Sequence, residues 1–379
     1  MINSAIRQVP MSAPDIGRRE IELVNQVLHS PILSLGPMLN RFEQLTAEFV
    51  GTKHAVGVSS GTSGLHMCMV AAGIGPGDEV ITSPFSFVAP ANCVLYERAT
   101  PVFADIDPHT LNIDPAQIES KITPRTKAIL PVHAFGQPAA MGPIMDIARR
   151  HNLLVIEDAC EAIGAEWRGQ QAGTFGDAGV FAYYPNKQMT TAEGGTIVTN
   201  RDDWNELFLS LRNQGRDVFD SWLTHSRLGF NYRLDELSAA LGVGQMERLN
   251  ELLDKRQAVA DLYSERLKSV EGVTPPFVSP DTTRMSWFVY VVRFDPSMDR
   301  DQVMARLQER GVPSRPYFSP IHLQKFYRER FDFKAGDFPV TEQVASATLA
   351  LPFHSNLSEA EVDYVCCQLA KGISECCKA

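Results

Sequence analysis

Between about residues 55 and 200, short apolar runs alternate with longer stretches in which apolar residues recur at helical spacing. The short runs predict strands over 54–59, 79–83, 101–105, 127–131, 153–157, 179–184 and 196–199. The longer stretches predict helices over 64–72, 91–98, 115–121 and 143–151. Because these strands are apolar on both faces, we expect a mostly parallel sheet covered by helices. The last two strands follow each other without a helix, so part of the sheet is expected to be antiparallel.

A different pattern begins at residue 234, where a long amphipathic helical stretch runs to residue 267. After it, the segment TPPFVSP indicates a linker. An alternating strand over 287–294, a helix over 300–310, a proline-rich loop over 311–322 and a final helix over 358–367 follow. The chain is too long for one small core. We therefore predict an α/β fold with a large domain over 1–250, N-terminal segment included, and a smaller α+β domain over 251–379.

Charge and composition exclude several classes of protein. The 379 residues carry a net charge of −10 without a long lysine or arginine run, so a nucleic-acid partner is not expected. Neither a secretory signal nor an apolar run long enough to cross a membrane is present, so no membrane association is expected. The seven cysteines are scattered and show no paired CxxC spacing, even at the doublets 366–367 and 376–377. We expect a cytoplasmic protein without a metal site.

Three segments are candidates for chemistry. Residues 59–66 read SSGTSGLH at the junction of a strand and a helix, where small residues and free N–H groups suit a phosphate. The alternative is a tight turn capped by Ser and Thr. Asp158 follows an apolar strand at the edge of the sheet where ligands bind, and its carboxylate can hold a positive charge such as a pyridinium N–H. The alternative is a helix cap.

The third segment, FAYYPNKQMTTAEGG, places Lys187 after an apolar strand and before a Thr pair and a Gly pair. Lysines in partly desolvated pockets form Schiff bases, because the loss of hydration favours the neutral, nucleophilic amine. An exposed turn is the alternative environment for such a lysine.

The three segments together resemble the DegT/DnrJ/EryC1/StrS family of aminotransferases, which depend on pyridoxal 5′-phosphate (PLP). The resemblance extends to GDEVITSPFSFVAPAN, LGFNYRLDELSAALG, RPYFSPIHLQKFY and LALPFHSNL, in the family's order and over nearly the whole chain. It implies a fold-type I PLP-dependent transferase. It also implies that Lys187 forms the Schiff base with PLP and that Asp158 pairs with the ring N–H, and both are catalytic residues.

The same resemblance implies roles for other residues. Gly61, Thr62 and Ser63 would hold the phosphate of PLP, and Phe87 would stack on its ring. Asn231 would reach the phosphate of PLP in the neighbouring subunit, which implies a homodimer with shared active sites. Asn231 could instead cap the helix that begins near residue 234. His322 would lie on the substrate side of the cleft.

The chain departs from the family's pattern at three positions. Ala182 stands where many members have a phosphate-binding serine, so one donor is lost. Glu161 stands where the family often has Gln, near the phenolic oxygen of PLP, and would repel that oxygen unless it is protonated or paired. Ala192 replaces a glycine and is expected to affect only local backbone shape.

The expected activity is transfer of an amino group, with glutamate as the donor, to a nucleotide-linked keto sugar. A PLP- or pyridoxamine-dependent sugar dehydratase is one alternative, although members of that branch carry His in place of the lysine. A regulator that keeps the fold without turnover is the other.

Overall fold

The computed structural model describes residues 7–217 and 224–376. Within these residues a seven-stranded sheet has the order β1-β9-β8-β5-β4-β2-β3. Its strands are β1 (His54–Val58), β2 (Glu79–Thr82), β3 (Thr100–Phe103), β4 (Thr126–Leu130), β5 (Leu154–Asp158), β8 (Ala178–Ala182) and β9 (Gly195–Thr199). Pairing is parallel from β3 through β2, β4 and β5 to β8, whereas β9 runs antiparallel to β8 and β1. The predicted mostly parallel sheet with an antiparallel part is confirmed.

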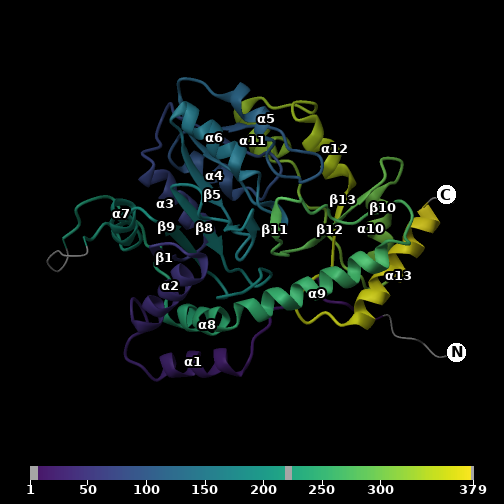
Figure 1. The fold of residues 1–379 in the computed structure, drawn as a ribbon, viewed down its shortest axis with the longest axis horizontal. Coiled ribbons are helices and arrows are strands. Elements are labelled where there is room, and N and C mark those ends of the chain that lie inside the picture. The colour runs from purple at the N-terminus through teal and green to yellow at the C-terminus, as the bar shows by residue number, and fades with distance from the viewer. Residues whose placement is uncertain (1–6, 218–223, 377–379) are drawn as a thin grey trace.

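Helices cover both faces of this sheet (Figure 1). In the first 250 residues they are α1 (Arg18–Leu28), α2 (Pro37–Val50), α3 (Gly61–Ala71), α4 (Ala89–Tyr96), α5 (Pro115–Ile118), η1 (Glu119–Lys121), η2 (Ala134–Gly136), α6 (Met141–His151), α7 (Asp202–Arg212) and α8 (Glu236–Glu247). Val180 and Ile197 face a core with α3, α4 and α7, while their neighbours Phe181 and Val198 face a core with α1, α2 and α8. This alternation is what strands buried on both faces require.

The chain after residue 248 forms α9 (Leu249–Leu267), β10 (Val273–Thr274), β11 (Thr282–Arg284), β12 (Tyr290–Phe294), α10 (Arg300–Glu309), η3 (Ile321–Leu323), α11 (Lys325–Phe331), α12 (Pro339–Ala347), β13 (Thr348–Leu351) and α13 (Glu359–Cys376). Strands β10, β12 and β13 make a second sheet. Two segments return to the large domain. Strand β11 pairs with the hairpin of β6 (Glu166–Trp167) and β7 (Gln170–Gln171), and Tyr327 of α11 donates to Asn92 of α4.

Helix α9 connects the two parts and is the long green helix that runs from beside α8 toward α13 in Figure 1. Its first turns contribute Leu249, Leu252 and Leu253 to the core with α1, α2 and α8. Its later turns contribute Val259, Ala260, Tyr263 and Leu267 to the core of the second sheet. We therefore propose that the boundary between the two domains lies within α9, near the predicted division at residue 250.

The structure also bears on the apolar character of the helices and on the cysteine doublets. In the part of the chain that the structure describes, no helix combines the length and apolar character needed to cross a membrane. Of the cysteine doublets, Cys366 is buried in α13, whereas Cys377 lies outside the described residues.

Candidate active site

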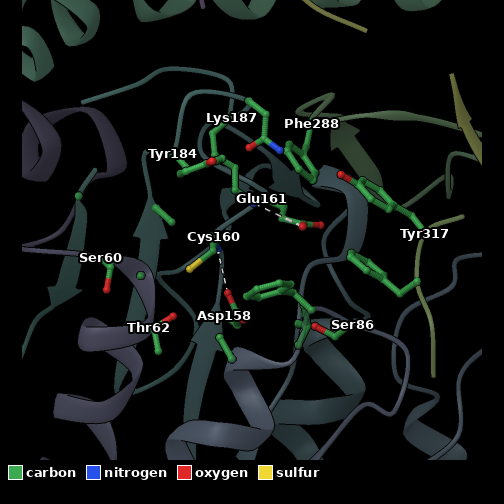
Figure 2. A pocket seen from close by; sticks show the side chains of 18 of the residues that line it. Ser60, Thr62, Ser86, Asp158, Cys160, Glu161, Tyr184, Lys187, Phe288 and Tyr317 are labelled. Atoms are coloured by element: carbon green, nitrogen blue, oxygen red, sulfur yellow. Dashed lines mark hydrogen bonds and ion pairs between the residues drawn. The ribbon is translucent and has the colours of Figure 1, made fainter. Parts of the chain in front are cut away.

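A cavity of about 420 Å³ lies where β5 ends and α3 begins. Figure 2 shows Lys187 and Phe288 on one side of this cavity and Asp158 on the other, with Ser60 and Thr62 at one end. The predicted site residues that line it are Gly61, Thr62, Phe87, Asp158, Glu161 and Lys187. Residues about 125 positions apart in the chain thus meet in one place, because the ends of β5 and β8 and the start of α3 share one edge of the sheet.

The start of α3 is held by a reciprocal pair of serines. Ser60 is the N-cap and accepts a hydrogen bond from the Ser63 N–H at 3.0 Å, while the Ser63 hydroxyl donates to the Ser60 carbonyl at 2.7 Å. Ser63 therefore shapes the turn and is not among the residues that line the cavity, so its role as a phosphate donor stays a prediction. Gly61 lets the turn approach the sheet closely, since a Cβ there would lie 2.6 Å from Cys160 Sγ and 2.8 Å from Ala182 Cβ.

Asp158 is the last residue of β5 and is buried. Its Oδ1 accepts a hydrogen bond from the Cys160 N–H at 3.0 Å. Burial raises the pKa of Asp158, and the bonds to Cys160 and the charge of Lys187 offset this only in part. A cation placed against this carboxylate would favour its ionised form.

Lys187 lies in the loop after β8, and its ammonium is enclosed. Lys187 Nζ lies 3.4 Å from Glu161 Oε1 and 3.9 Å from the centroid of the Phe288 ring. Glu161 Oε2 accepts a second hydrogen bond, from the Phe135 N–H at 2.9 Å. Burial raises the pKa of Glu161, while Lys187 lowers it. The carboxylate that replaces the family's Gln is therefore paired with Lys187 itself.

Asn231 and His322 do not line this cavity. Asn231 is exposed and pairs through its backbone with Asn213. The N-cap of α8 is Asp235, which accepts from the Ser238 N–H at 2.9 Å, so the alternative role of Asn231 as a helix cap is wrong.

His322 is fully buried within η3 and lies 3.0 Å, through Nε2, from Glu342 Oε1. Its ring packs against Phe338 at 4.7 Å between centroids. His322 is therefore buried against Glu342 and Phe338, and its predicted position on the substrate side of the cleft stays a prediction. Its neighbours Ile321 and Gln324 instead line a second cavity.

This second cavity, of about 500 Å³, adjoins the first and shares Ser86, Phe87, Tyr317 and Phe318 with it. Phe87 is 62% exposed between the two cavities. Further walls come from Phe326 and Tyr327 of α11. The two cavities together form an aromatic-lined space between the large domain and the loop over 311–322.

Several lining residues were not predicted as site residues: Ser60, Tyr184, Asn186, Glu193, Phe288 and Tyr317. Ser60, Tyr184 and Asn186 stand inside the quoted motifs, so their closeness to Gly61 and Lys187 was an available signal. Tyr317 also stands inside a quoted motif, whereas Phe288 lies outside them, and no local pattern shows that Phe288 faces Lys187.

The residues around the cavity fit PLP. The N-terminus of the 11-residue helix α3 provides N–H groups and a positive dipole end for a phosphate. Asp158 provides a buried anion for a protonated ring nitrogen, and Lys187 provides a primary amine. The buried Asn186 Oδ1, which lines the same cavity, has no hydrogen-bond partner among the described residues. This set combines an anion site, an anionic side chain and an amine around one space.

Comparisons with known proteins agree with this chemistry. Residues 14–370 match the DegT/DnrJ/EryC1/StrS aminotransferase family. The chain is 41% identical over 366 residues to GDP-perosamine synthase of Caulobacter vibrioides, covering 96% of this chain and 97% of that protein.

Two solved structures are similar throughout. Helicobacter pylori PseC, an aminotransferase involved in the biosynthesis of pseudoaminic acid, superposes with a TM-score of 0.92 at 29% identity, covering 97% of this chain and all 100% of that one. DesV of S. venezuelae, solved in complex with a ketimine intermediate, superposes with a TM-score of 0.88 at 34% identity, covering 93% of each chain. The chain belongs to the DegT/DnrJ/EryC1/StrS aminotransferase family, and it is a PLP-dependent aminotransferase.

Proposed function

We propose that this enzyme transfers an amino group from glutamate to a keto sugar that is linked to a nucleotide. The observation that carries the proposal is that Lys187, Asp158 and the N-terminus of α3 surround one cavity, with a second, aromatic-lined cavity beside it. The first cavity suits the cofactor and the reacting carbon. The second offers space for the rest of a large substrate.

In this proposal N–H groups at the start of α3 and the Thr62 hydroxyl would hold the phosphate of PLP. Asp158 would pair with the ring nitrogen, Phe87 would stack on the ring and Lys187 would attach the cofactor. When bound, PLP supplies an electron sink for the carbon that loses a proton. Asp158 acts by keeping its negative charge beside the ring nitrogen, which stabilises the protonated ring.

Lys187 moves the proton. As a free amine, Nζ would accept the proton that leaves the substrate carbon and would donate it again within the same cavity. The Phe288 ring covers one side of Nζ at 3.9 Å and shields that side from water. Glu161 Oε1, at 3.4 Å, limits where the ammonium can lie.

The second cavity supports a nucleotide-linked substrate. Its walls include Phe87, Tyr317, Phe318, Phe326 and Tyr327, and aromatic faces bind planar bases by stacking. The relative that is named GDP-perosamine synthase favours a GDP-linked keto sugar as the first substrate to test.

We also propose a homodimer in which each active site takes residues from both chains. Asn231 is exposed and does not line the cavity of its own chain. Leu228, in the same segment, is 87% exposed. Such an apolar side chain beside an exposed amide suits a surface that a second copy covers.

The proposal is tested by supplying glutamate with GDP-, UDP- and dTDP-linked keto sugars and measuring 2-oxoglutarate. We expect 2-oxoglutarate and an equal amount of amino sugar with at least one of them. A dehydratase would yield a deoxy sugar and no amino sugar, and where it depends on pyridoxamine it would release the nitrogen of glutamate as ammonia; a regulator would produce neither product. Either result would contradict the proposal.

Lys187 is tested separately with borohydride, which reduces a Schiff base to a stable amine. Mass spectrometry should then find the cofactor on Lys187. Lys187→Ala should lower turnover by roughly 1000-fold or more, because the proton carrier and the attachment point are lost together. Attachment to a different lysine would show that the cofactor has been placed wrongly.

A further inference from the structure

Helix α9 buries a continuous stripe of side chains, and one of them is charged. The stripe consists of Leu249, Leu252, Leu253, Arg256, Val259, Ala260, Tyr263 and Leu267. The residues before Arg256 belong to one hydrophobic core and those after it to another. Arg256 is 2% exposed and therefore lies inside the molecule, where the two cores meet.

The guanidinium of Arg256 binds the backbone of two segments that form the active site. Nη2 donates to the carbonyl of Lys187 at 2.7 Å and lies 3.5 Å from that of Asn186. Nη1 donates to the carbonyls of Trp287 at 3.2 Å and Phe288 at 3.1 Å. One side chain thus joins the loop that carries Lys187 to the connection between β11 and β12 that carries Phe288.

The environment of Arg256 is costly for a cation. Among the described residues it forms no ion pair with a carboxylate, and its Nε is buried without a hydrogen-bond partner. Burial lowers the pKa of Arg256 to about 10. A neutral side chain of similar volume would stabilise an ordinary core better. The ring of Phe353, 5.6 Å from the guanidinium carbon, compensates only in part.

We infer that Arg256 is a positioning residue for Lys187: it fixes the Lys187 backbone relative to Phe288 and so holds Lys187 Nζ between the Phe288 ring and the Glu161 carboxylate. The inference rests on the proposed role of Lys187. Through the side chain of Arg256, α9 also links the position of the Lys187 amine to the second domain.

The fork of an arginine is needed for this role. Two nitrogens at fixed separation donate to carbonyls of two different segments, whereas a lysine ammonium is a single point on a flexible stem. Arg256→Lys keeps the charge and loses the fork, and Arg256→Met loses both. If Arg256 only stabilised the fold, Arg256→Met would lower stability, because the buried carbonyls of Lys187, Trp287 and Phe288 would lose their donor, but it would leave the reactivity of Lys187 in the folded protein unchanged.

The first measurement uses the cofactor-free protein. Lys187 is acetylated competitively with acetic anhydride across a range of pH, and mass spectrometry compares its rate with that of the exposed Lys127. In both Arg256 variants we expect a changed ratio of rates and a changed pH dependence for Lys187. Ratios equal to those of the wild type in both variants would overturn the inference.

The second measurement uses the PLP-bound enzyme. We expect the pH dependence of its visible absorption to shift and kcat to fall by roughly 10- to 100-fold, because small displacements of a reacting group are costly. KM for the amino donor should change much less. Arg300→Met is the matched control, since Arg300 donates to the carbonyls of Ala345 and Thr348, neither of which lines the cavity. Arg300→Met should change none of these readouts.

The outcomes separate the inference from the proposed function. If borohydride fixes no cofactor on Lys187 in the wild type, the role of Lys187 fails. If borohydride fixes the cofactor on Lys187 in the wild type, but the folded Arg256 variants match the wild type in acetylation and in visible absorption, only the inference about Arg256 fails. Should Arg256→Met not fold, Arg256→Lys decides. Loss of folding in both variants would also overturn it, because Arg256 would then serve stability alone.

Discussion

Glu161 is a buried carboxylate whose pKa burial raises above the ordinary value, despite the Lys187 ammonium beside it. A carboxyl group whose pKa is higher in the folded protein than in the unfolded chain stabilises the folded protein at low pH. This contribution is lost as the pH rises from the unfolded-state pKa, about 4.3, through the folded-state pKa. We therefore expect Glu161→Gln, in the cofactor-free protein, to gain stability relative to the wild type as the pH rises above about 4.3.

The measurement is thermal unfolding of both proteins between about pH 4 and about pH 8, so that the range begins below the unfolded-state pKa of about 4.3. Glu161→Gln also removes the partner of Lys187, and this changes the Tm of the variant by an amount that hardly depends on pH in this range. The informative quantity is therefore how the difference in Tm between the variant and the wild type changes with pH. Parallel curves would show that Glu161 ionises in the folded protein as easily as in the unfolded chain.

Asp158 allows a test of charge without a change of shape. Asp158→Asn keeps the bond that Oδ1 accepts from the Cys160 N–H but removes the negative charge. We expect an intact fold by circular dichroism and turnover lower by roughly 100-fold or more, because a neutral amide cannot hold a protonated ring nitrogen. Near-normal turnover would place the ring nitrogen elsewhere.

Single residues show what sequence patterns can and cannot predict. Lys187 and Asp158 stand in distinctive motifs that follow strands, and both line the cavity. Ser63 stands in an equally distinctive motif, but its hydroxyl is used by the turn. Which serine faces the ligand depends on the geometry of the cap, and that geometry is not visible in the spacing SSGTS. The contact between Arg256 and Lys187 joins residues 69 positions apart and has no local signal.

At the scale of elements, the N-terminus of α3 is the part that binds an anion. Ser60→Ala removes the cap that accepts from the Ser63 N–H. We expect a loss of about 1 kcal/mol of stability together with weaker binding of PLP, because the fraying turn no longer presents its N–H groups to the phosphate. Thermal unfolding and titration of the cofactor-free protein with PLP measure the two effects.

The control for this variant is Asp299→Ala. Asp299 caps α10 by accepting from the N–H groups of Asp301 and Gln302 and lies outside the cavity. It should cost a similar amount of stability and leave the affinity for PLP unchanged. Equal losses of affinity in both variants would mean that the effect on PLP follows from stability alone.

The elements were predictable where the pattern was regular. All seven strands of the central sheet lie within two residues of their predicted bounds, since apolar runs between helices are a strong signal. Helices α1, α2 and α7 were not predicted, although α2 has Pro37 at its first position and ends at Gly51 with a φ of 81°. Strand β11 was also missed, because three residues that pair with a distant hairpin have no periodicity of their own.

At the scale of the whole molecule, the shared-site dimer is tested by mixing two variants, Lys187→Ala and Asn231→Ala. In a mixed dimer with shared sites, one site has both lesions and the other has neither, because a two-fold axis exchanges the contributions. Random exchange of subunits should therefore restore activity at about a quarter of the wild-type sites. Mixing Lys187→Ala with Asp158→Asn is the control: both residues line one cavity of one chain, so every site keeps a lesion and no activity returns. Full activity of Asn231→Ala alone, or no recovery although mass spectrometry shows mixed dimers, would mean that each chain completes its own site.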